Sequence, residues 1–240
     1  MVNIMELPQG EMMPSLEDGE RLGICFPVHG WRPPVVVRNF IGRLSLEAQG
    51  HYVYAACTAG DTLGETMDLL RQDLALRSIA LDACFSVKMP NTYVGLPFMD
   101  VDSEKLEREK LLAANDKLKD ICQKVSRRFV GEAKLDIGRW PKINSRVLGK
   151  LFVDRLITDG PFRVDSARCV KCGICAEVCP AHDITGRLGQ EPTWHHDGSC
   201  LTCFACYHHC PHHAIEYGNR TQKKGQYFLK HHRKQPPNII

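Results

Sequence analysis

The sequence predicts an α/β protein, in which a doubly wound parallel sheet is followed by a small α+β domain rich in cysteine. Residues 21–129 alternate between short apolar runs and longer amphipathic stretches, the pattern of strands separated by helices. After residue 160 the composition shifts to Cys, His and Pro, and one cysteine pattern occurs twice. We expect these two regions to form separate cores, for which 240 residues are sufficient.

Three apolar runs are expected to form the buried strands of the sheet. They lie at residues 22–28, 51–57 and 83–87. Continuous apolar runs are typical of parallel strands that are covered by helices on both faces. Strands joined by helices in this way imply right-handed βαβ crossovers.

The amphipathic stretches between these runs predict the covering helices. Pro33 and Pro34 open the first helix, and Thr62 and Glu65 have capping-box spacing at the start of the second. A third helix is expected from about residue 103 to residue 130, with Gly131 placed to end it. The stripes expected to face the core are Val37, Phe40, Ile41 and Leu44; Leu63, Met67, Leu70 and Leu74; and Leu111, Leu118, Cys122, Val125 and Phe129.

The pattern divides the chain into four segments. Residues 1–131 form the sheet domain and residues 132–161 a connector, followed by the cysteine-rich domain at 162–217 and a basic tail at 218–240. The connector is expected to hold a short amphipathic helix around Val147, Leu148, Leu151 and Phe152. The tail has six Lys or Arg residues and no acid, so it is either a solvated tail or a docking arm for an acidic partner.

The overall composition excludes several classes of protein. A net charge of +3 gives no strong field for nucleic acid, and 43 % apolar residues are ordinary for a globular protein. No segment reaches the ~18 apolar residues expected of a membrane span. The first residues are acidic and lack the pattern of a secretory signal, so we expect a cytoplasmic protein in a reducing environment.

The cysteine pattern carries the most specific signal. Of twelve cysteines, eight occur in two copies of Cys-x-x-Cys-x-x-Cys-x-x-x-Cys-Pro that are offset by 31 residues, from Cys169 and from Cys200. The first three thiolates of each copy can converge on one [4Fe–4S] cluster, whereas the fourth ligates the other cluster in two-cluster ferredoxins. We therefore expect two clusters with interlocked ligands. One cluster takes Cys169, Cys172, Cys175 and Cys210, and the other takes Cys200, Cys203, Cys206 and Cys179.

Alternatives to this interpretation are weaker. Cys₄ zinc sites usually use two separated cysteine pairs, not three evenly spaced cysteines followed by Cys-Pro. Gly173 follows the second cysteine of the first copy, whereas Phe204 occupies that position in the second, which predicts a more shielded second site. The nearby histidines are interpreted as surface residues: His182, His195, His196, His208, His209, His212 and His213. The remaining cysteines are expected to be buried free thiols: Cys25, Cys57, Cys84 and Cys122.

Four stretches carry a resemblance that covers nearly the whole chain. The protein resembles the flavodoxin-fused two-cluster ferredoxins of anaerobic bacteria and archaea, the EFR-type ferredoxin family. The resembling stretches are residues 23–31 (GICFPVHGW), 55–60 (AACTAG), 87–93 (VKMPNTY) and 162–165 (FRVD). The resemblance implies a flavodoxin-like first domain, with FMN at the carboxyl ends of the strands. The residues that it places in those loops are Gly30, Trp31, Ala59, Gly60, Asp61 and Asn91.

These loops also have plainer explanations. Trp31 could pack against Pro33, and Gly60 and Asp61 could simply turn the chain into a helix. The sequence also departs from the family, because it has no Ser/Thr/Gly-rich phosphate loop after a first strand. It begins at the family's second strand, expected at residues 2–7, either because the protein is longer or because the domain has degenerated. We therefore expect this chain to bind FMN poorly.

The preferred function is electron transfer between redox proteins. Residues 163–217 have four basic and six acidic residues, hence a charge of −2, and an acidic carrier suits basic docking patches. An FMN-dependent iron–sulfur oxidoreductase is the enzymatic alternative, and a metal-stabilised interaction module is the structural one. The oligomeric state is left open.

Overall fold

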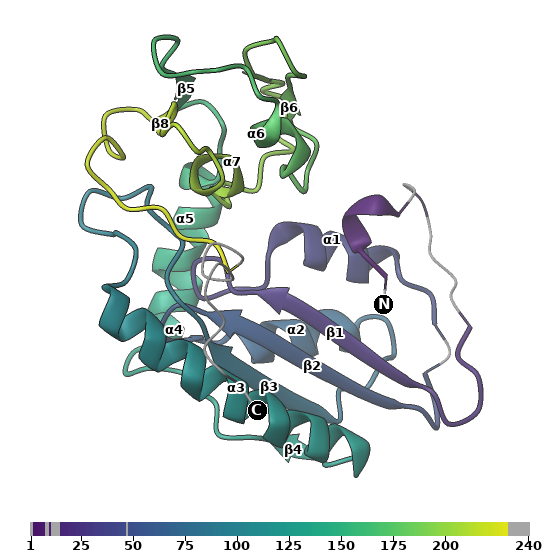
Figure 1. Cartoon of the computed structure of the whole chain (residues 1–240). Helices are drawn as coiled ribbons and strands as arrows, with labels where there is room; N and C mark the ends of the chain where they lie inside the picture. Colours follow the sequence, from purple (N-terminus) through teal and green to yellow (C-terminus); the bar gives the residue numbers. More distant parts are fainter. Residues whose placement is uncertain (1, 8–9, 11–14, 47, 230–240) are drawn as a thin grey trace. The chain divides into compact units, whose positions relative to one another are not determined.

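The computed structural model describes residues 2–7, 10, 15–46 and 48–229, which form two compact units (Figure 1). The first unit comprises the described residues of Met1–Met89 and Glu104–Leu156. The second comprises those of Pro90–Ser103 and Ile157–Ile240. The segment Pro90–Ser103 therefore leaves the sheet unit and belongs to the cysteine-rich unit.

The first unit is built on a parallel sheet, as the sequence predicts. Its strands are β1 (Arg21–Pro27), β2 (Tyr52–Ala59), β3 (Ala83–Lys88) and β4 (Gly131–Glu132), in the order β1-β2-β3-β4 (Figure 1). The first three agree with the expected runs to within two residues. Gly131 does not end a helix but begins β4, with a φ of +114°.

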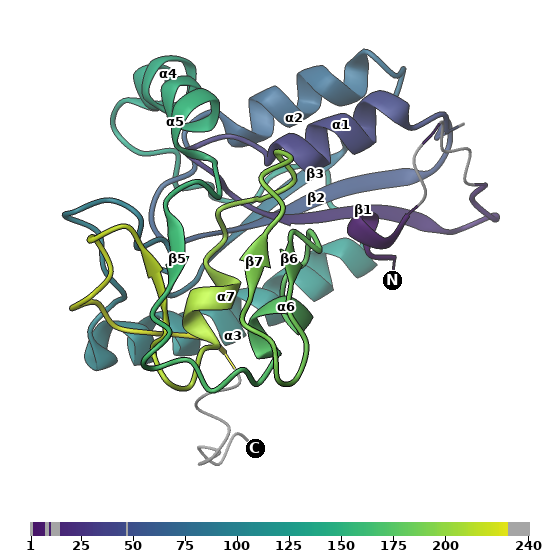
Figure 2. The ribbon, with the colours of Figure 1, turned by 90° about the horizontal axis from the view of Figure 1, so that it is seen from above.

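Helices cover both faces of this sheet. The helices α1 (Val35–Arg43) and α2 (Thr66–Ala75) lie on one face, and α3 (Glu104–Ser126) lies on the other (Figure 2). Neighbouring residues of β3 consequently point into different cores. Cys84 packs with α1 and α2, whereas Phe85 packs with α3, and both side chains are fully buried. Helices on both faces of a parallel sheet are the doubly wound arrangement.

The expected stripe of α2 is confirmed, whereas that of α3 is correct for Val125 and Phe129, which pack against the core, and wrong for Leu118 and Cys122. Leu63, Met67, Leu70 and Leu74 are all buried. On α3 the buried residues are Ala114 and Ile121, while Leu118 is half exposed and Cys122 is exposed. The helix is rotated relative to the expected stripe, so that small and β-branched residues, not Leu118, face the strands.

The prediction that all four scattered cysteines are buried is correct for two of them. Cys57 and Cys84 are buried, and burial raises their pKa values to about 12 and about 11. Cys25 is exposed, contrary to expectation, because β1 lies at the edge of the sheet and buries only Ile24 and Phe26. An edge strand that is covered on one face alone alternates in burial.

The N-terminal residues do not add a strand to the sheet. The expected strand at 2–7 is wrong: Ile4–Glu6 is a 3₁₀ turn, labelled η1, capped by the Asn3 side chain, which accepts from the Met5 N–H at 3.1 Å. Asn3 also donates to Glu6 Oε1 at 2.8 Å, and such local bonds compete with a sheet ladder. The sheet nevertheless has no gap, since β1 pairs directly with β2 from Arg21–Tyr52 to Pro27–Thr58.

The connector forms one continuous helical segment of the first unit. It consists of α4 (Pro141–Ile143), a π-helical turn η2 (Asn144–Leu148) and α5 (Gly149–Leu156). The expected stripe is wrong here as well, because Val147, Leu148 and Leu151 are exposed while Ser145 and Gly149 are buried. Small residues let this segment approach the loop after β1 closely: a Cβ on Gly149 would lie 2.1 Å from Gly30 O.

Ser145 and its neighbour explain why the predicted capping box does not form. Ser145 Oγ accepts from the Glu65 N–H at 2.7 Å and donates to Trp31 O at 2.8 Å. The Glu65 carboxylate pairs with Arg146 at 2.6 and 3.1 Å. Thr62 Oγ1 accepts from Trp31 Nε1 at 3.1 Å. Tertiary contacts therefore take both capping-box side chains, and α2 begins without a side-chain cap.

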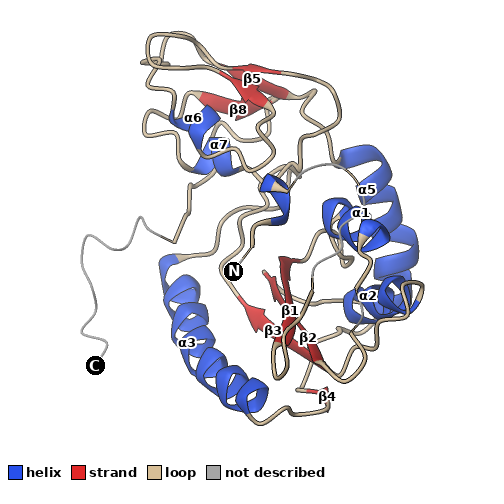
Figure 3. Ribbon diagram, turned by 90° about the vertical axis from the view of Figure 1, so that its right-hand side faces the viewer, coloured by secondary structure: helices blue, strands red, loops and turns tan. Residues whose placement is uncertain are grey.

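The described part of the second unit contains two short antiparallel strand pairs and two short helices. β5 (Phe162–Val164) pairs antiparallel with β8 (Ile215–Tyr217) (Figure 3), and β6 (Ile184–Thr185) pairs with β7 (Thr193–Trp194) (Figure 2). The helices are α6 (Ile174–Glu177) and α7 (Ala205–His208). A shift of 31 residues carries α6 onto α7. The same shift carries the start of β5 onto the start of β7, and the start of β6 onto the start of β8. Across the described part of the chain, no helix has the length and apolarity to cross a membrane.

Candidate metal centre

The two cysteine-rich copies follow the same backbone path. Three positions in each copy have positive φ, and the two sets correspond under the shift of 31 residues. The pairs are Lys171 (57°) and Thr202 (48°), Gly173 (79°) and Phe204 (61°), and His182 (51°) and His213 (48°). Left-handed backbone is costly for residues other than glycine, so its recurrence indicates that the tight loops are imposed by their role. The repeat is thus structural as well as sequential.

One cavity in the second unit is lined by four thiols. Three are contributed by the first loop, as Cys169, Cys172 and Cys175, and the fourth by Cys210 of the second copy. Burial raises the pKa of Cys175 to about 11, and the neighbouring Cys210 and Cys172 raise it further. The Ala214 N–H donates to Cys210 Sγ at 3.2 Å. A thiol from each copy therefore faces thiols of the other.

A second cavity repeats this arrangement with the copies exchanged. It is lined by Cys200, Cys203 and Cys206 of the second loop and by Cys179 of the first copy. Burial raises the pKa of Cys206 well above its usual value, and Cys203, Cys200 and Cys179 raise it further. The Thr202 N–H donates to Cys200 Sγ at 3.4 Å. The expected ligand sets are thus each gathered around one cavity.

The eight thiols are divided between two cavities. Four thiols line each cavity. Among the residues that the structure describes, no group of three or more Cys, His, Asp or Glu side chains is arranged to hold one metal ion.

The two cavities differ in how well they are shielded. Gly173 and Phe204 occupy the same left-handed position before α6 and α7, but only Phe204 carries a side chain, which is 1 % exposed. The Phe204 ring packs edge to face against Tyr93 with centroids 5.3 Å apart, and it lies 5.3 Å from the Phe162 ring. The expectation of a more crowded second site agrees with this packing.

The segment Pro90–Ser103 completes the core of this unit. Val94 is fully buried in the cluster of apolar side chains that includes Phe204, and Tyr93 packs against that cluster. Lys224 binds the segment from the other side. Its ammonium donates to Val94 O at 2.9 Å, to Met99 O at 2.6 Å and to Leu96 O. The sequence reasoning missed this contribution, although the apolar run after residue 92 was a signal of burial.

The described part of the basic tail is also packed onto this unit. Thr221 and Tyr227 are buried, and Tyr207 Oη donates to Lys224 O at 2.8 Å. Residues 218–229 are therefore neither a solvated tail nor a free arm. The remainder of the predicted tail, residues 230–240, lies outside the described residues.

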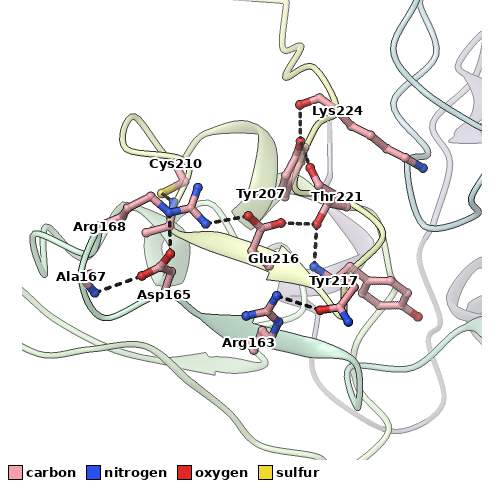
Figure 4. Close-up of polar contacts among 12 residues, drawn as sticks. Arg163, Asp165, Ala167, Arg168, Tyr207, Cys210, Glu216, Tyr217, Thr221 and Lys224 are labelled. Atoms are coloured by element: carbon pink, nitrogen blue, oxygen red, sulfur yellow. Dashed lines mark hydrogen bonds and ion pairs between the residues drawn. The ribbon is translucent and has the colours of Figure 1, made fainter.

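A polar network fixes the chain where it enters the first loop (Figure 4). Arg168 donates to Asp165 at 2.7 Å and to the buried Glu216 of β8 at 2.6 Å. Thr221 Oγ1 donates in turn to Glu216 Oε2 at 2.5 Å and accepts from the Tyr217 N–H at 2.8 Å. Arg168 directly precedes Cys169, so these contacts hold the first thiol in register with β8.

One histidine departs from the expectation that all seven are surface residues. His208 is 3 % exposed, and burial lowers its pKa to about 4. Its Nε2 lies 2.7 Å from Thr92 O, and its Nδ1 accepts from the Tyr227 N–H at 3.2 Å. This histidine is a neutral link between the packed tail and the Pro90–Ser103 segment.

The loop residues expected at an FMN site are engaged in contacts of other kinds. Trp31 donates to Thr62, Gly30 lies against the α5 segment, and Gly60 O accepts from Lys110 Nζ at 2.7 Å. Ala59 is buried, whereas the Asp61 carboxylate is 86 % exposed and lies 3.9 Å from Lys88 Nζ. Asn91 belongs to the second unit, where its side chain donates to Tyr93 O and Asp100 O. Of the six residues, five therefore belong to the first unit and Asn91 to the second.

Comparison with known proteins supports the iron–sulfur interpretation of the second unit. Residues 162–211 match a family model described as a 4Fe-4S dicluster domain. The match begins at β5 and ends just after Cys210, so it includes all eight cysteines of the two copies. Comparison with curated proteins gives no match for the chain. Residues 162–211 are thus a ferredoxin-like iron–sulfur region, which supports a role in electron transfer.

Proposed function

We propose that the second unit binds two [4Fe–4S] clusters and passes single electrons between redox partners. The observation that carries the proposal is the exchange of the fourth thiol: Cys210 joins the first loop at one cavity, and Cys179 joins the second loop at the other. A Cys₄ set at each cavity is the ligand set of a [4Fe–4S] cluster. Each cluster, when bound, supplies one-electron chemistry without protein acid or base groups.

The surrounding residues act by holding the thiols and excluding water. Cys175 and Cys206 are 8 % and 7 % exposed, so these two thiols are shielded from water, while the other six are partly buried. The Thr202 and Ala214 N–H groups point at ligand sulfurs, where they stabilise negative charge. Hydrogen bonds to the sulfurs and burial are the two means by which a protein sets the potential of such a centre.

The charge of the region favours a carrier that docks on other proteins. Residues 163–217 have a net charge of −2 before any cluster is bound. Acidic carriers are steered electrostatically onto basic patches of their partners.

Anaerobic reconstitution with iron and sulfide tests the proposal. We expect iron and acid-labile sulfide sufficient for two four-iron clusters per chain, and an EPR spectrum of two interacting centres after reduction with dithionite. Flavin analysis of the same sample should find no stoichiometric FMN. An EPR-silent protein that binds zinc would instead support a metal-stabilised interaction module, and one FMN per chain would support the oxidoreductase.

A further inference from the structure

The second cavity contains a buried carboxylate that its own hydrogen bonds do not satisfy. Asp183 is fully buried, and its Oδ1 accepts from Ser199 Oγ at 3.2 Å. Its other oxygen, Oδ2, has no hydrogen-bond partner among the described residues. An unsatisfied buried polar atom is costly, and more so when it belongs to an ionisable group. The arrangement therefore leaves Oδ2 available to a ligand.

The position of this carboxylate points to the ligand. Asp183 lines the same cavity as Cys179, Cys200 and Cys203. The Asp183 side chain accepts a hydrogen bond from the Cys200 thiol. The backbone holds it there, because the His195 N–H donates to Asp183 O at 2.9 Å. The carboxylate and the Cys200 thiol therefore lie side by side at one cavity.

The repeat offers a built-in comparison. Under the shift of 31 residues, Asp183 corresponds to Ala214, which lines the first cavity beside Cys169 and Cys210. Ala214 presents no side-chain donor. Besides its four thiols, the first cavity is lined by the imidazole of His212, whereas the second adds the Asp183 carboxylate to its four thiols.

We propose that Asp183 is a fifth, oxygen ligand of the second cavity, able to hold the iron atom that Cys200 otherwise binds. The inference rests on the proposed function, since it requires a cluster in that cavity. Carboxylates are established ligands of protein-bound iron. Replacing a thiolate with a carboxylate exchanges one anionic ligand for another, so the exchange needs neither an oxidant nor a reductant.

Removing each of two equivalent cysteines tests the inference. The variants Cys200→Ala and Cys169→Ala, reconstituted anaerobically as full-length protein, lose the first thiol of the second and of the first loop. We expect Cys200→Ala to keep four-iron clusters in both cavities, with an altered EPR spectrum for the second. Cys169→Ala, here and below always combined with His212→Ala so that the first cavity has no substitute ligand, should instead hold one iron fewer per chain and show the EPR signal of an oxidised three-iron cluster.

Second-site variants separate ligation from a structural role. Cys200→Ala combined with Asp183→Ala should lose the iron that Cys200→Ala retains, whereas Cys200→Ala combined with Ser199→Ala should retain it. Alanine is accommodated at the equivalent position of the other copy, so the change at Asp183 is compatible with the loop. The inference is overturned if Cys200→Ala and Cys169→Ala lose iron equally.

A gain-of-ligand variant keeps the test decisive if Cys200→Ala does not fold. Adding Ala214→Asp to Cys169→Ala gives the first cavity the carboxylate that the second has. Recovery of the lost iron supports the inference, and a persistent three-iron signal overturns it. Absence of clusters from the wild-type protein under the same conditions would count against the proposed function instead.

Discussion

Lys224 offers a direct test of whether the Pro90–Ser103 segment is a working part of the cluster unit. Its ammonium donates to three carbonyl oxygens of that segment, and burial lowers its pKa. A Lys224→Met change keeps much of the aliphatic chain but removes the donor. The carbonyls of Val94, Leu96 and Met99 then lose a shared partner, while Val94 must remain buried for the core to persist.

The expected loss of stability follows from these contacts. A hydrogen bond to a charged group contributes about 1.5–3 kcal/mol net. Three acceptors share one ammonium here, so their contributions do not simply add. We expect Lys224→Met to lower the free energy of unfolding of the cluster unit by about 3 kcal/mol. With a urea m value of about 1–3 kcal/mol per molar, the midpoint falls by about 1–3 M.

The measurement is anaerobic urea unfolding of the reconstituted protein, followed by its iron–sulfur absorbance. Lys223→Met is the matched control, because it removes the same charge from the adjacent exposed residue. We expect the control to unfold with the wild-type midpoint. Equal midpoints for Lys223→Met and Lys224→Met would refute the reasoning, since the segment would then contribute nothing to the cluster unit.

Three further predictions address the wiring, the pH dependence and the shielding. Cys210→Ala should change the EPR signal of the cluster held by the first loop, and Cys179→Ala the signal of the cluster held by the second loop. If each variant instead changed the signal of the cluster in its own loop, crossed ligation would be contradicted. Burial lowers the pKa of His29 to about 4. Between about pH 4 and 6.5 the unfolded state therefore binds more protons than the folded state. The free energy of unfolding rises with pH over this range, by about 3 kcal/mol in all. His29→Gln should flatten this slope in denaturant titrations at pH 5 and 7, and an unchanged slope would exclude the assignment. Phe204→Gly relieves about 1–2 kcal/mol of left-handed backbone strain but loses about 3–5 kcal/mol of packing energy. The iron–sulfur absorbance of the second cluster should then bleach faster in air. Equal bleaching rates for both clusters would argue against shielding by Phe204.

The sheet was predictable because its strands carry their own signal. Runs such as residues 83–87 are apolar at every residue except Ser86, and this reflects burial between two layers of helices. The N-terminal segment could not be assigned in the same way. Residues 2–7 form too short an apolar run to distinguish a strand from a turn, and the side chain of Asn3 decides the outcome through two local bonds.

The errors in burial share one physical cause. Whether Cys25 is covered depends on the place of β1 in the sheet, and no local pattern encodes that place. The same holds for Glu65, whose spacing from Thr62 suggests a cap but whose carboxylate pairs with Arg146, 81 residues away. Long-range partners override local propensity in both cases.

Parts of the candidate site could be predicted from local sequence, whereas others depend on tertiary structure. Cysteine spacing predicts the loops and the exchange of their fourth thiols, because a tight loop leaves the backbone few ways to bring three sulfurs together. The orphaned oxygen of Asp183 is not visible in the sequence, since the same residue on the surface would have no consequence. Comparing the two copies shows that Asp183 corresponds to Ala214, but most other positions between the cysteines also differ, so this change alone does not mark the site.

The near-symmetry of the two cavities makes their differences informative. Because the copies share one backbone path, the inequivalence of the centres must arise from the positions at which their side chains differ. In the first loop Val170 is 56 % exposed, and Gly173 has no side chain and lies against Leu188, which is 84 % exposed. In the second loop Phe204 closes that position and Tyr93 packs over it. A partner protein can therefore approach the first cavity more closely than the second. We expect electrons to enter and leave at the first loop, while the second centre, with its additional carboxylate, is the interior one.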